Sequence, residues 1–280
     1  MEKLDPAAFE FAAPVRYSET THDGMMSLPA LIDLFQDCSI FHSERIGYGP
    51  ALLKAEHKAW VLTHWHIVVD RYPKLAEQIT VGTFASSFKT VSAGRDFYLR
   101  DAEGAVIARA HSTWGFMDLS VGKPVRPAAE HVAAYGLGTP LEMPKESRKI
   151  ALPAAEDLRA CDPITVRRDL IDTNEHVNNS QYVRIALGAL SDEVRPHRVR
   201  VDYRRSAVLG DIIRPHMAIE EDRTVVLLAD EDGTHYGVVE LRQPARLEPE
   251  CKTGPAHCRA CLVSMVEMKG FEPSAPTLRT

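Results

Sequence analysis

The stretch VRYSETTHDGMMSLPALIDLF, residues 15–35, decides the fold because the chain repeats it as VRRDLIDTNEHVNNSQYVRIA, residues 166–186. The two stretches align without a gap; both begin with Val-Arg and both pass from a polar turn into apolar residues at helical spacing. Such internal similarity is typical of two copies of one structural unit. The chain is therefore expected to fold as two related halves.

Each half is expected to contain one long amphipathic helix. In the first half, apolar residues recur at helical spacing at Leu31, Leu34, Phe35, Cys38 and Phe41. Ser27 suits the N-cap of this helix, and Pro29 is tolerated in its first turn. In the second half, the same spacing is kept by Tyr182, Ile185, Ala186 and Ala189.

Strand-like sequence follows each helix in the same order. Segments rich in β-branched and aromatic residues lie at 60–70, 79–88 and 95–116, and again at 197–205, 211–220 and 224–242. The hairpin turns also correspond, because 99–104 and 228–233 are each closed by glycine. The pattern predicts an α+β fold in which each half packs a long helix against a curved antiparallel sheet.

Prolines mark the join between the halves, at Pro124, Pro127, Pro140, Pro144 and Pro153. Such density is typical of an exposed linker rather than a core element. The expected organisation is an N-terminal half at 1–138, a proline-rich linker at 139–163 and a C-terminal half at 164–246. The remaining residues, 247–280, have no counterpart in the first half and are expected to be a disordered tail.

Composition limits the class of protein. The chain has 280 residues, 45% hydrophobic content and a net charge of −6, as expected of a globular protein without general affinity for nucleic acid. No apolar run approaches the roughly 18 residues of a membrane span, and the first residues lack the pattern of a signal peptide. Five cysteines do not suggest a disulfide framework. A cytoplasmic location is expected.

Three motifs, in order along the chain, carry a resemblance to a known family. They are IVVDRYP at 67–73, DTNEHVNNSQY at 172–182 and YRR at 203–205. On these motifs the sequence from about Phe11 to Arg242 resembles the acyl-acyl carrier protein (acyl-ACP) thioesterases of plants and bacteria. The resemblance implies two hotdog folds in tandem, with each fold formed by one half of the chain.

The resemblance also implies hydrolysis of fatty acyl-ACP, which releases free fatty acid and ends chain elongation. It places the catalytic acid, amide and imidazole of the family on Asp172, Asn174 and His176. Without the family match, the same stretch would more often be a turn with an asparagine helix cap. Many plant members have Glu-Cys directly after YRR, whereas this chain has Ser206 and Ala207. A cysteine nucleophile is therefore excluded at that place.

The chemistry of a thioester gives these residues an independent rationale. Its carbonyl is already activated, so hydrolysis needs a positioned water, a base and donors for the oxyanion, and no cofactor is expected. Backbone N–H groups of the helix that follows Asn178 can stabilise the oxyanion. A carboxylate beside an imidazole can share the proton transfers, and which of Asp172 and His176 activates the water stays open. Ser206 and Asn178 are assigned supporting roles.

The first half has lost these catalytic groups. In the gapless alignment, Thr21, Asp23 and Met25 stand where Asp172, Asn174 and His176 stand. Methionine adapts to a flexible apolar ligand. An acyl-chain pocket is therefore predicted in the first half, formed by Met25, Met26, Leu31 and Phe35. A tandem chain supplies both halves of a site itself, so either a monomer or a homodimer is compatible.

Arginines gather near the second motif despite the negative net charge. Strand alternation places Arg198, Arg200 and Arg204 on one face. Acyl carrier proteins are acidic and present their cargo on phosphopantetheine, so these arginines are predicted to bind the carrier. A solvated sheet face is the alternative interpretation. A broad acyl-CoA thioesterase and a non-catalytic acyl-binding protein also remain as alternative functions.

No metal site is expected. His64 and His66 lie on one face of a predicted strand, without an apparent carboxylate or cysteine partner. The tail contains a more metal-like set at Cys251, His257, Cys258 and Cys261, but a structural zinc site usually draws on a second ligand pair within a fold.

Overall fold

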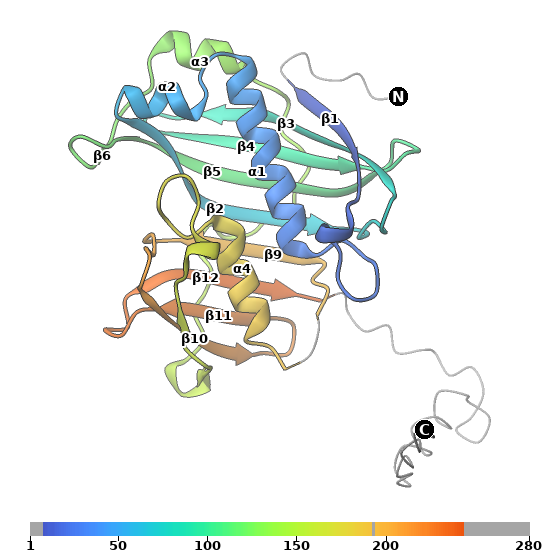
Figure 1. Ribbon diagram of the computed structural model, residues 1–280, viewed down its shortest axis with the longest axis vertical. Coiled ribbons are helices and arrows are strands. Elements are labelled where there is room, and N and C mark those ends of the chain that lie inside the picture. Colours follow the sequence, from blue (N-terminus) through green and yellow to red (C-terminus); the bar gives the residue numbers. More distant parts are fainter. Residues whose placement is uncertain (1–7, 192–193, 244–280) are drawn as a thin grey trace, which may run out of the picture. The chain divides into compact units, whose positions relative to one another are not determined.

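The computed structural model describes residues 8–191 and 194–243 (Figure 1). The first half contains β1 (Phe9–Pro14), η1 (Tyr17–Glu19), α1 (Leu28–Arg45), α2 (Pro50–Ala55), β2 (Lys58–Val69), β3 (Gln78–Phe88), β4 (Ser92–Arg100), β5 (Val106–Asp118), β6 (Lys123–Pro124) and α3 (Ala129–Tyr135). The remainder contains η2 (Ala155–Asp157), β7 (Arg159–Ala160), β8 (Ile164–Thr165), η3 (Arg168–Leu170), α4 (Asn179–Gly188), β9 (Arg198–Tyr203), β10 (Ile212–Ile219), β11 (Thr224–Ala229) and β12 (His235–Arg242). Of the residues described, none belongs to a helix long and apolar enough to cross a membrane.

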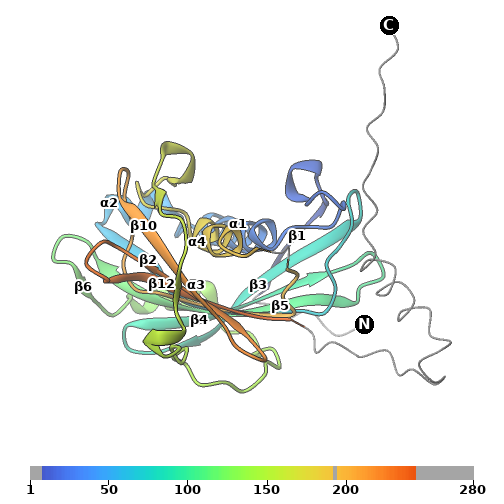
Figure 2. The same ribbon diagram turned by 90° about the horizontal axis from the view of Figure 1, so that it is seen from below.

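The strands of both halves join in one antiparallel sheet. Its order is β1-β3-β4-β5-β2-β9-β12-β11-β10-β7, with β6 paired to β5 and β8 paired to β10. The halves meet where β2 pairs with β9, in a register that sets His64 opposite Asp202 and Val68 opposite Arg198. The two long helices, α1 and α4, lie side by side on the same face of this sheet (Figure 2). The predicted α+β architecture is confirmed.

The sequence signals at the helix ends have the predicted effect. Ser27 caps α1, and its side chain accepts a hydrogen bond from the Ala30 N–H at 3.3 Å. Asn178 caps α4 in the same way, accepting from the Ser180 N–H at 2.9 Å. Each cap satisfies a backbone donor that has no acceptor within its helix.

The main core lies between the helices and the sheet. On the first-half side it is built around the rings of Phe35, Trp65 and Phe97, all fully buried. The ring of Phe97 lies 5.3 Å from that of Phe35 and 4.9 Å from that of Trp65. Aromatic rings at such separations add packing energy to the burial of their apolar surface. The core therefore fixes α1 against the strands of the first half.

The proline-rich linker does not behave as a purely exposed segment, which corrects the sequence expectation. The Leu141 N–H donates to the Asp96 carboxylate at 2.8 Å, and the Ile150 N–H donates to the Asp202 carboxylate at 3.3 Å. The Ile150 side chain is buried in a second small core with residues of β11 and β12. The linker is thus tied to the sheet, and prolines along it did not exclude burial of an isoleucine.

The strands on both sides of the linker belong to one sheet, so the sheet itself does not mark a boundary between the halves. The division at residues 138, 163 and 246 stays a prediction. The tail at 247–280, with Cys251, His257, Cys258 and Cys261, lies outside the described residues.

Candidate active site

The second polar turn is held in a fixed shape by its own backbone. The Asp172 N–H donates to the His176 carbonyl at 2.8 Å, and the Glu175 N–H donates to the Asp172 carbonyl at 3.0 Å. Glu175 has a φ of 62°, in the left-handed region that glycine favours. A non-glycine residue in this conformation carries local strain, which is common at functional sites.

The predicted catalytic side chains all belong to this turn. The Asp172 carboxylate accepts from the Asn174 backbone N–H at 2.8 Å and lies 3.4 Å from the side-chain nitrogen of Asn174. Asn174 and His176 are exposed, and Asp172 is half-buried. The structure records no hydrogen bond of the His176 imidazole within residues 8–191 and 194–243. The carboxylate is therefore engaged with the amide, while the imidazole is presented to solvent.

Residues after β9 brace the other side of the turn. The Val177 N–H donates to the Ala207 carbonyl at 2.9 Å, and the Ala207 N–H donates to the Tyr182 hydroxyl at 2.8 Å. Burial raises the pKa of Tyr182 to about 12, so its hydroxyl stays protonated. Ser206 directly precedes this brace and is exposed. Its predicted supporting role stays a prediction.

Helix α1 contributes polar contacts that the sequence analysis missed. The side-chain amide of Asn179 donates to the Gln36 side-chain oxygen at 2.8 Å. Asp33 is half-buried; burial raises the pKa of its carboxyl, while a hydrogen bond from Ser180 and the charge of Arg184 partly oppose that rise. The available signal was Asp33, which interrupts an otherwise apolar run at 28–35. The N-terminus of α4 is thus held by both halves.

The first polar turn has the same backbone as the second. The Thr21 N–H donates to the Met25 carbonyl at 2.8 Å, as Asp172 does to His176. Gly24 has a φ of 77° where Glu175 has 62°. The gapless alignment of the two halves is therefore confirmed at the level of individual hydrogen bonds.

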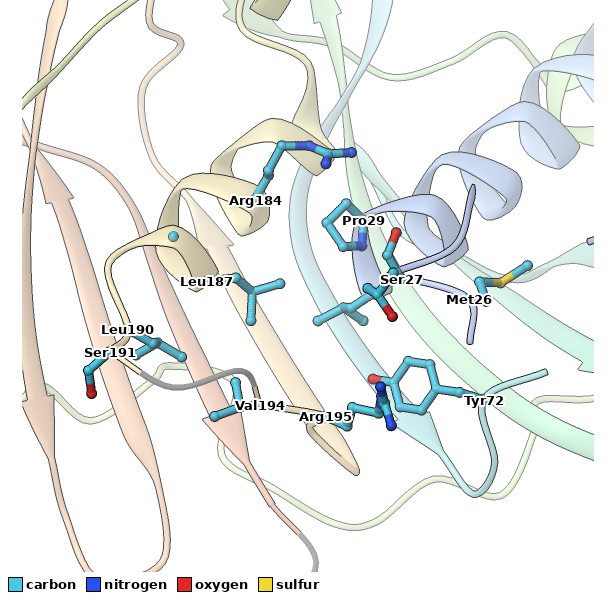
Figure 3. Close-up of a pocket in the computed structure, with 13 residues that line it drawn as sticks. Met26, Ser27, Pro29, Tyr72, Arg184, Leu187, Leu190, Ser191, Val194 and Arg195 are labelled. Atoms are coloured by element: carbon cyan, nitrogen blue, oxygen red, sulfur yellow. The ribbon is translucent and has the colours of Figure 1, made fainter. Parts of the chain in front are cut away.

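The four residues predicted for the acyl pocket do not share one cavity. A cavity of about 360 Å³ lies between the N-terminus of α1 and the C-terminus of α4, and Met26 lines it (Figure 3). Met25, Leu31 and Phe35 do not line it; Leu31 and Phe35 are fully enclosed in the core. Their assignment to an acyl pocket stays a prediction, and it requires movement of core side chains.

The predicted carrier-binding face is partly covered. Arg200 is only 4% exposed and lies 3.1 Å from Glu146 of the linker and 3.4 Å from Glu240. Arg198 pairs with the same Glu146 at 2.9 Å, while Arg204 is exposed. The prediction that Arg200 forms an accessible rim is therefore wrong, because the linker covers this part of β9.

One of the two histidines of β2, His64, has a partner that the sequence did not show. The His64 imidazole lies 2.7 Å from the Asp202 carboxylate, which comes from the other half of the chain. Burial lowers the pKa of His66 to about 4, so this imidazole is neutral near pH 7. Within the described part of the chain, no group of three or more His, Cys, Asp or Glu residues is placed to hold a metal ion.

Two domain models of one protein family match the chain, one in each half. Residues 6–135 match the acyl-ACP thioesterase N-terminal domain, and residues 155–240 match the acyl-ACP thioesterase C-terminal domain. The chain belongs to the acyl-ACP thioesterase family. The matches cover most of the sequence and include the polar turns of both halves.

Curated members of the family are distant in sequence. The chain is 27% identical over 213 residues to chloroplastic oleoyl-acyl carrier protein thioesterase 2 of Arabidopsis thaliana, an alignment covering 68% of this chain and 57% of that protein. It is also 27% identical over 203 residues to a chloroplastic acyl-[acyl-carrier-protein] hydrolase of Cuphea viscosissima, covering 68% of this chain and 48% of that protein. The chain thus spans about half the length of the curated relatives that it matches.

Solved structures of the family share the fold. An acyl-ACP thioesterase from Bacteroides thetaiotaomicron superposes with a TM-score of 0.77 at 21% identity, covering 84% of this chain and 97% of that one. A 12:0-ACP thioesterase from Umbellularia californica gives a TM-score of 0.73 at 20% identity, covering 86% of this chain and 98% of that one. The predicted tandem hotdog fold is confirmed.

Proposed function

We propose that this chain hydrolyses the thioester of fatty acyl-ACP, releasing free fatty acid, and that the turn at 172–176 performs the chemistry. The observation that carries the proposal is the placement of a carboxylate, an amide and an exposed imidazole directly before the N-terminus of α4. Family membership supports the same reaction, since relatives are named acyl-ACP thioesterases and hydrolases.

In the proposed mechanism, a water molecule attacks the thioester carbonyl carbon while its proton passes to the base formed by Asp172 and His176. The negative charge on the carbonyl oxygen is stabilised at the start of α4. The Asn179 N–H is the first of that helix and has no acceptor within it. It lies at the N-terminal end, where the helix dipole stabilises a negative charge. The carbon–sulfur bond then breaks, and the thiolate takes up the proton from the base.

Asn174 has two roles in this proposal. Its hydrogen bonds with Asp172 orient the carboxylate, and the remaining hydrogen-bonding capacity of its amide can hold the attacking water. Ser206 is exposed beside the brace at Ala207 and can hydrogen-bond the same water. A cysteine nucleophile is excluded directly after YRR, because Ala207 stands where many plant members have cysteine.

The proposed carrier surface excludes Arg200 and keeps Arg198 and Arg204. The Arg204 guanidinium lies 3.1 Å from His235 and directly precedes the segment that braces the catalytic turn. An acidic carrier arriving with its phosphopantetheine arm would meet this arginine at the edge of the site. We place the reaction in the cytoplasm, although the plant relatives are named chloroplastic.

The deciding experiment measures hydrolysis of one acyl chain on acyl carrier protein and on coenzyme A. A kcat/KM at least tenfold higher on the carrier supports the proposal. Equal values identify a broad acyl-CoA thioesterase instead. Binding without turnover on either substrate identifies a non-catalytic acyl-binding protein.

The carrier surface has a separate test. Arg204→Glu should raise KM for the carrier substrate at low salt, with little effect on a small acyl thioester that has no carrier. Arg214→Glu provides the control, because Arg214 is a half-buried arginine of β10 paired with Glu231. Equal losses on both substrates would assign Arg204 to the fold or the pocket.

A further inference from the structure

We propose that Gln36 of α1 is a positioning residue for hydrolysis, which holds Asn179 so that the backbone N–H of Asn179 faces the thioester oxygen. Helices α1 and α4 lie side by side (Figure 2), and the side-chain amide of Asn179 donates to the Gln36 side-chain oxygen at 2.8 Å. This role rests on the proposed function, in which the oxyanion forms at the start of α4. It gives the first half of the chain a part in the chemistry of the second.

The Asn179 N–H differs from its neighbours at the start of α4, because they already have acceptors. On one side, the Asn178 N–H donates to the Leu170 carbonyl at 2.9 Å. On the other, the N–H groups of Ser180 and Gln181 donate to the side chain and the carbonyl of Asn178, both at 2.9 Å. Within the described part of the chain, no acceptor is recorded for the Asn179 N–H itself. It is therefore the donor that an oxyanion at this helix end would meet.

The carbonyl of Asn179 is fixed from the second half. It accepts a hydrogen bond from the Tyr203 hydroxyl at 2.9 Å. Burial raises the pKa of Tyr203 well above its usual value, so this hydroxyl stays protonated and remains a donor. The Tyr203 ring also packs edge-on against Tyr182, with 5.7 Å between the ring centres. Rotation of Asn179 about its backbone would break the bond to Tyr203 or the bond to Gln36, so the direction of its N–H is preorganised.

The equivalent positions in the other pair of turn and helix are apolar. In the gapless alignment of the two halves, Leu187 of α4 stands for Gln36, and Leu28 of α1 stands for Asn179. The chain thus has an amide pair beside the turn that carries the proposed catalytic groups, and leucines at the matching positions beside the turn that lacks them. This difference favours a role in the chemistry over a role in helix packing alone.

A positioning role and a packing role have different kinetic signatures. An oxyanion donor acts on charge that develops only in the transition state, so its misplacement lowers kcat and leaves KM nearly unchanged. Loss of a contact that only joins two helices lowers the stability of the fold, and leaves the turnover of the folded protein intact.

The test is a double-mutant cycle on kcat, measured with one acyl chain on acyl carrier protein and on coenzyme A. Gln36→Leu and Asn179→Leu each install the side chain of the equivalent position, and each should lower kcat about tenfold with KM within about twofold. The double variant should also lose about tenfold, because both changes remove the same hydrogen bond. Asp37→Leu is the matched control, since Asp37 is the next residue of α1 and is exposed. Its kcat should stay within about twofold of wild type.

Thermal unfolding of each variant ensures that kcat is compared between folded proteins. Unchanged kcat in Gln36→Leu would overturn the proposal. So would a loss of about a hundredfold in the double variant, because the two side chains would then act independently. Asn179→Leu breaks the same bond from the other half, so it decides the question if Gln36→Leu does not fold. Wild type without turnover on either substrate would instead overturn the proposed function, and the role of Gln36 with it.

Discussion

The turns at 21–25 and 172–176 share a backbone and differ in chemistry. Both close through the same two hydrogen bonds, both place their fourth residue in the left-handed region, and both lead into a capped helix. Only the second turn carries a carboxylate, an amide and an imidazole at its alternate positions. The comparison teaches that the fold maintains the shape of the turn, whereas the side chains decide whether the turn can catalyse.

The largest expected effect separates the two turns by activity. His176→Ala should reduce kcat/KM on acyl-ACP by about 10³-fold, because it removes part of the general base. Met25→Ala, at the equivalent place in the first turn, should reduce it less than tenfold. Steady-state kinetics on folded variants provide the measurement. Comparable losses in both variants would mean that the first turn also takes part in the chemistry.

A second effect concerns the stability of the sheet in the second half, apart from catalysis. Glu240 of β12 is 1% exposed and contacts Arg223 at 2.7 Å, Arg242 at 3.3 Å and Arg200 at 3.4 Å. Glu240→Gln should lower the free energy of unfolding by about 2 kcal/mol, because it removes the buried carboxylate that these guanidinium groups share, while each of them keeps a second acidic partner. Urea unfolding at pH 7 measures this cost. Glu231→Gln, at an exposed ion pair, should cost less than 1 kcal/mol.

The same carboxylate predicts a dependence of stability on pH. Burial alone would raise the pKa of Glu240, but the hydrogen bond from Arg223 and the charges of Arg200 and Arg242 outweigh it and lower the pKa below 4.5. A lowered pKa stabilises the folded state above pH 4.5, and this contribution is lost as pH falls through the folded pKa. Wild type should therefore lose more stability than Glu240→Gln between pH 5 and pH 3. Parallel losses would remove Glu240 from the explanation.

The helix caps predict a smaller effect that should be equal in the two halves. Asn178→Ala and Ser27→Ala each remove a side chain that accepts a backbone hydrogen bond. Each should cost about 1 kcal/mol of unfolding free energy. Only Asn178→Ala should also lower turnover, because Asn178 fixes the start of α4 beside the catalytic turn. A loss of turnover with Ser27→Ala would show that the two helix starts are functionally coupled.

The smallest effect concerns the left-handed residue of each turn. Gly24→Ala should destabilise by about 1 kcal/mol, since a Cβ at φ 77° is strained even though no atom lies within 4 Å of it. Glu175→Gly should change stability by less than about 0.5 kcal/mol, because relief of strain is offset by the greater freedom of glycine in the unfolded chain. Thermal unfolding of both variants tests this, and a large gain from Glu175→Gly would reveal greater strain in the catalytic turn.

Sequence patterns predicted local structure better than long-range contacts. Ser27, Asn178 and the apolar spacing of α1 act within a few residues, so their effects follow from the sequence alone. The contact between His64 and Asp202 joins residues 138 positions apart, through the pairing of β2 with β9. The burial of Arg200 depends on Glu146 in the linker. Neither contact has a local signature, because each depends on how the two halves and the linker meet.

The most direct test of the account replaces one turn by the other. The changes Asp172→Thr, Thr173→His, Asn174→Asp, Glu175→Gly and His176→Met give the second turn the side chains of the first. Because the two backbones match, this variant should keep the far-ultraviolet circular dichroism of the wild type and melt within a few degrees of it. Its hydrolysis of acyl-ACP should fall by at least about 10²-fold. A folded variant with near wild-type turnover would contradict the account, because the chemistry would then not reside in this turn.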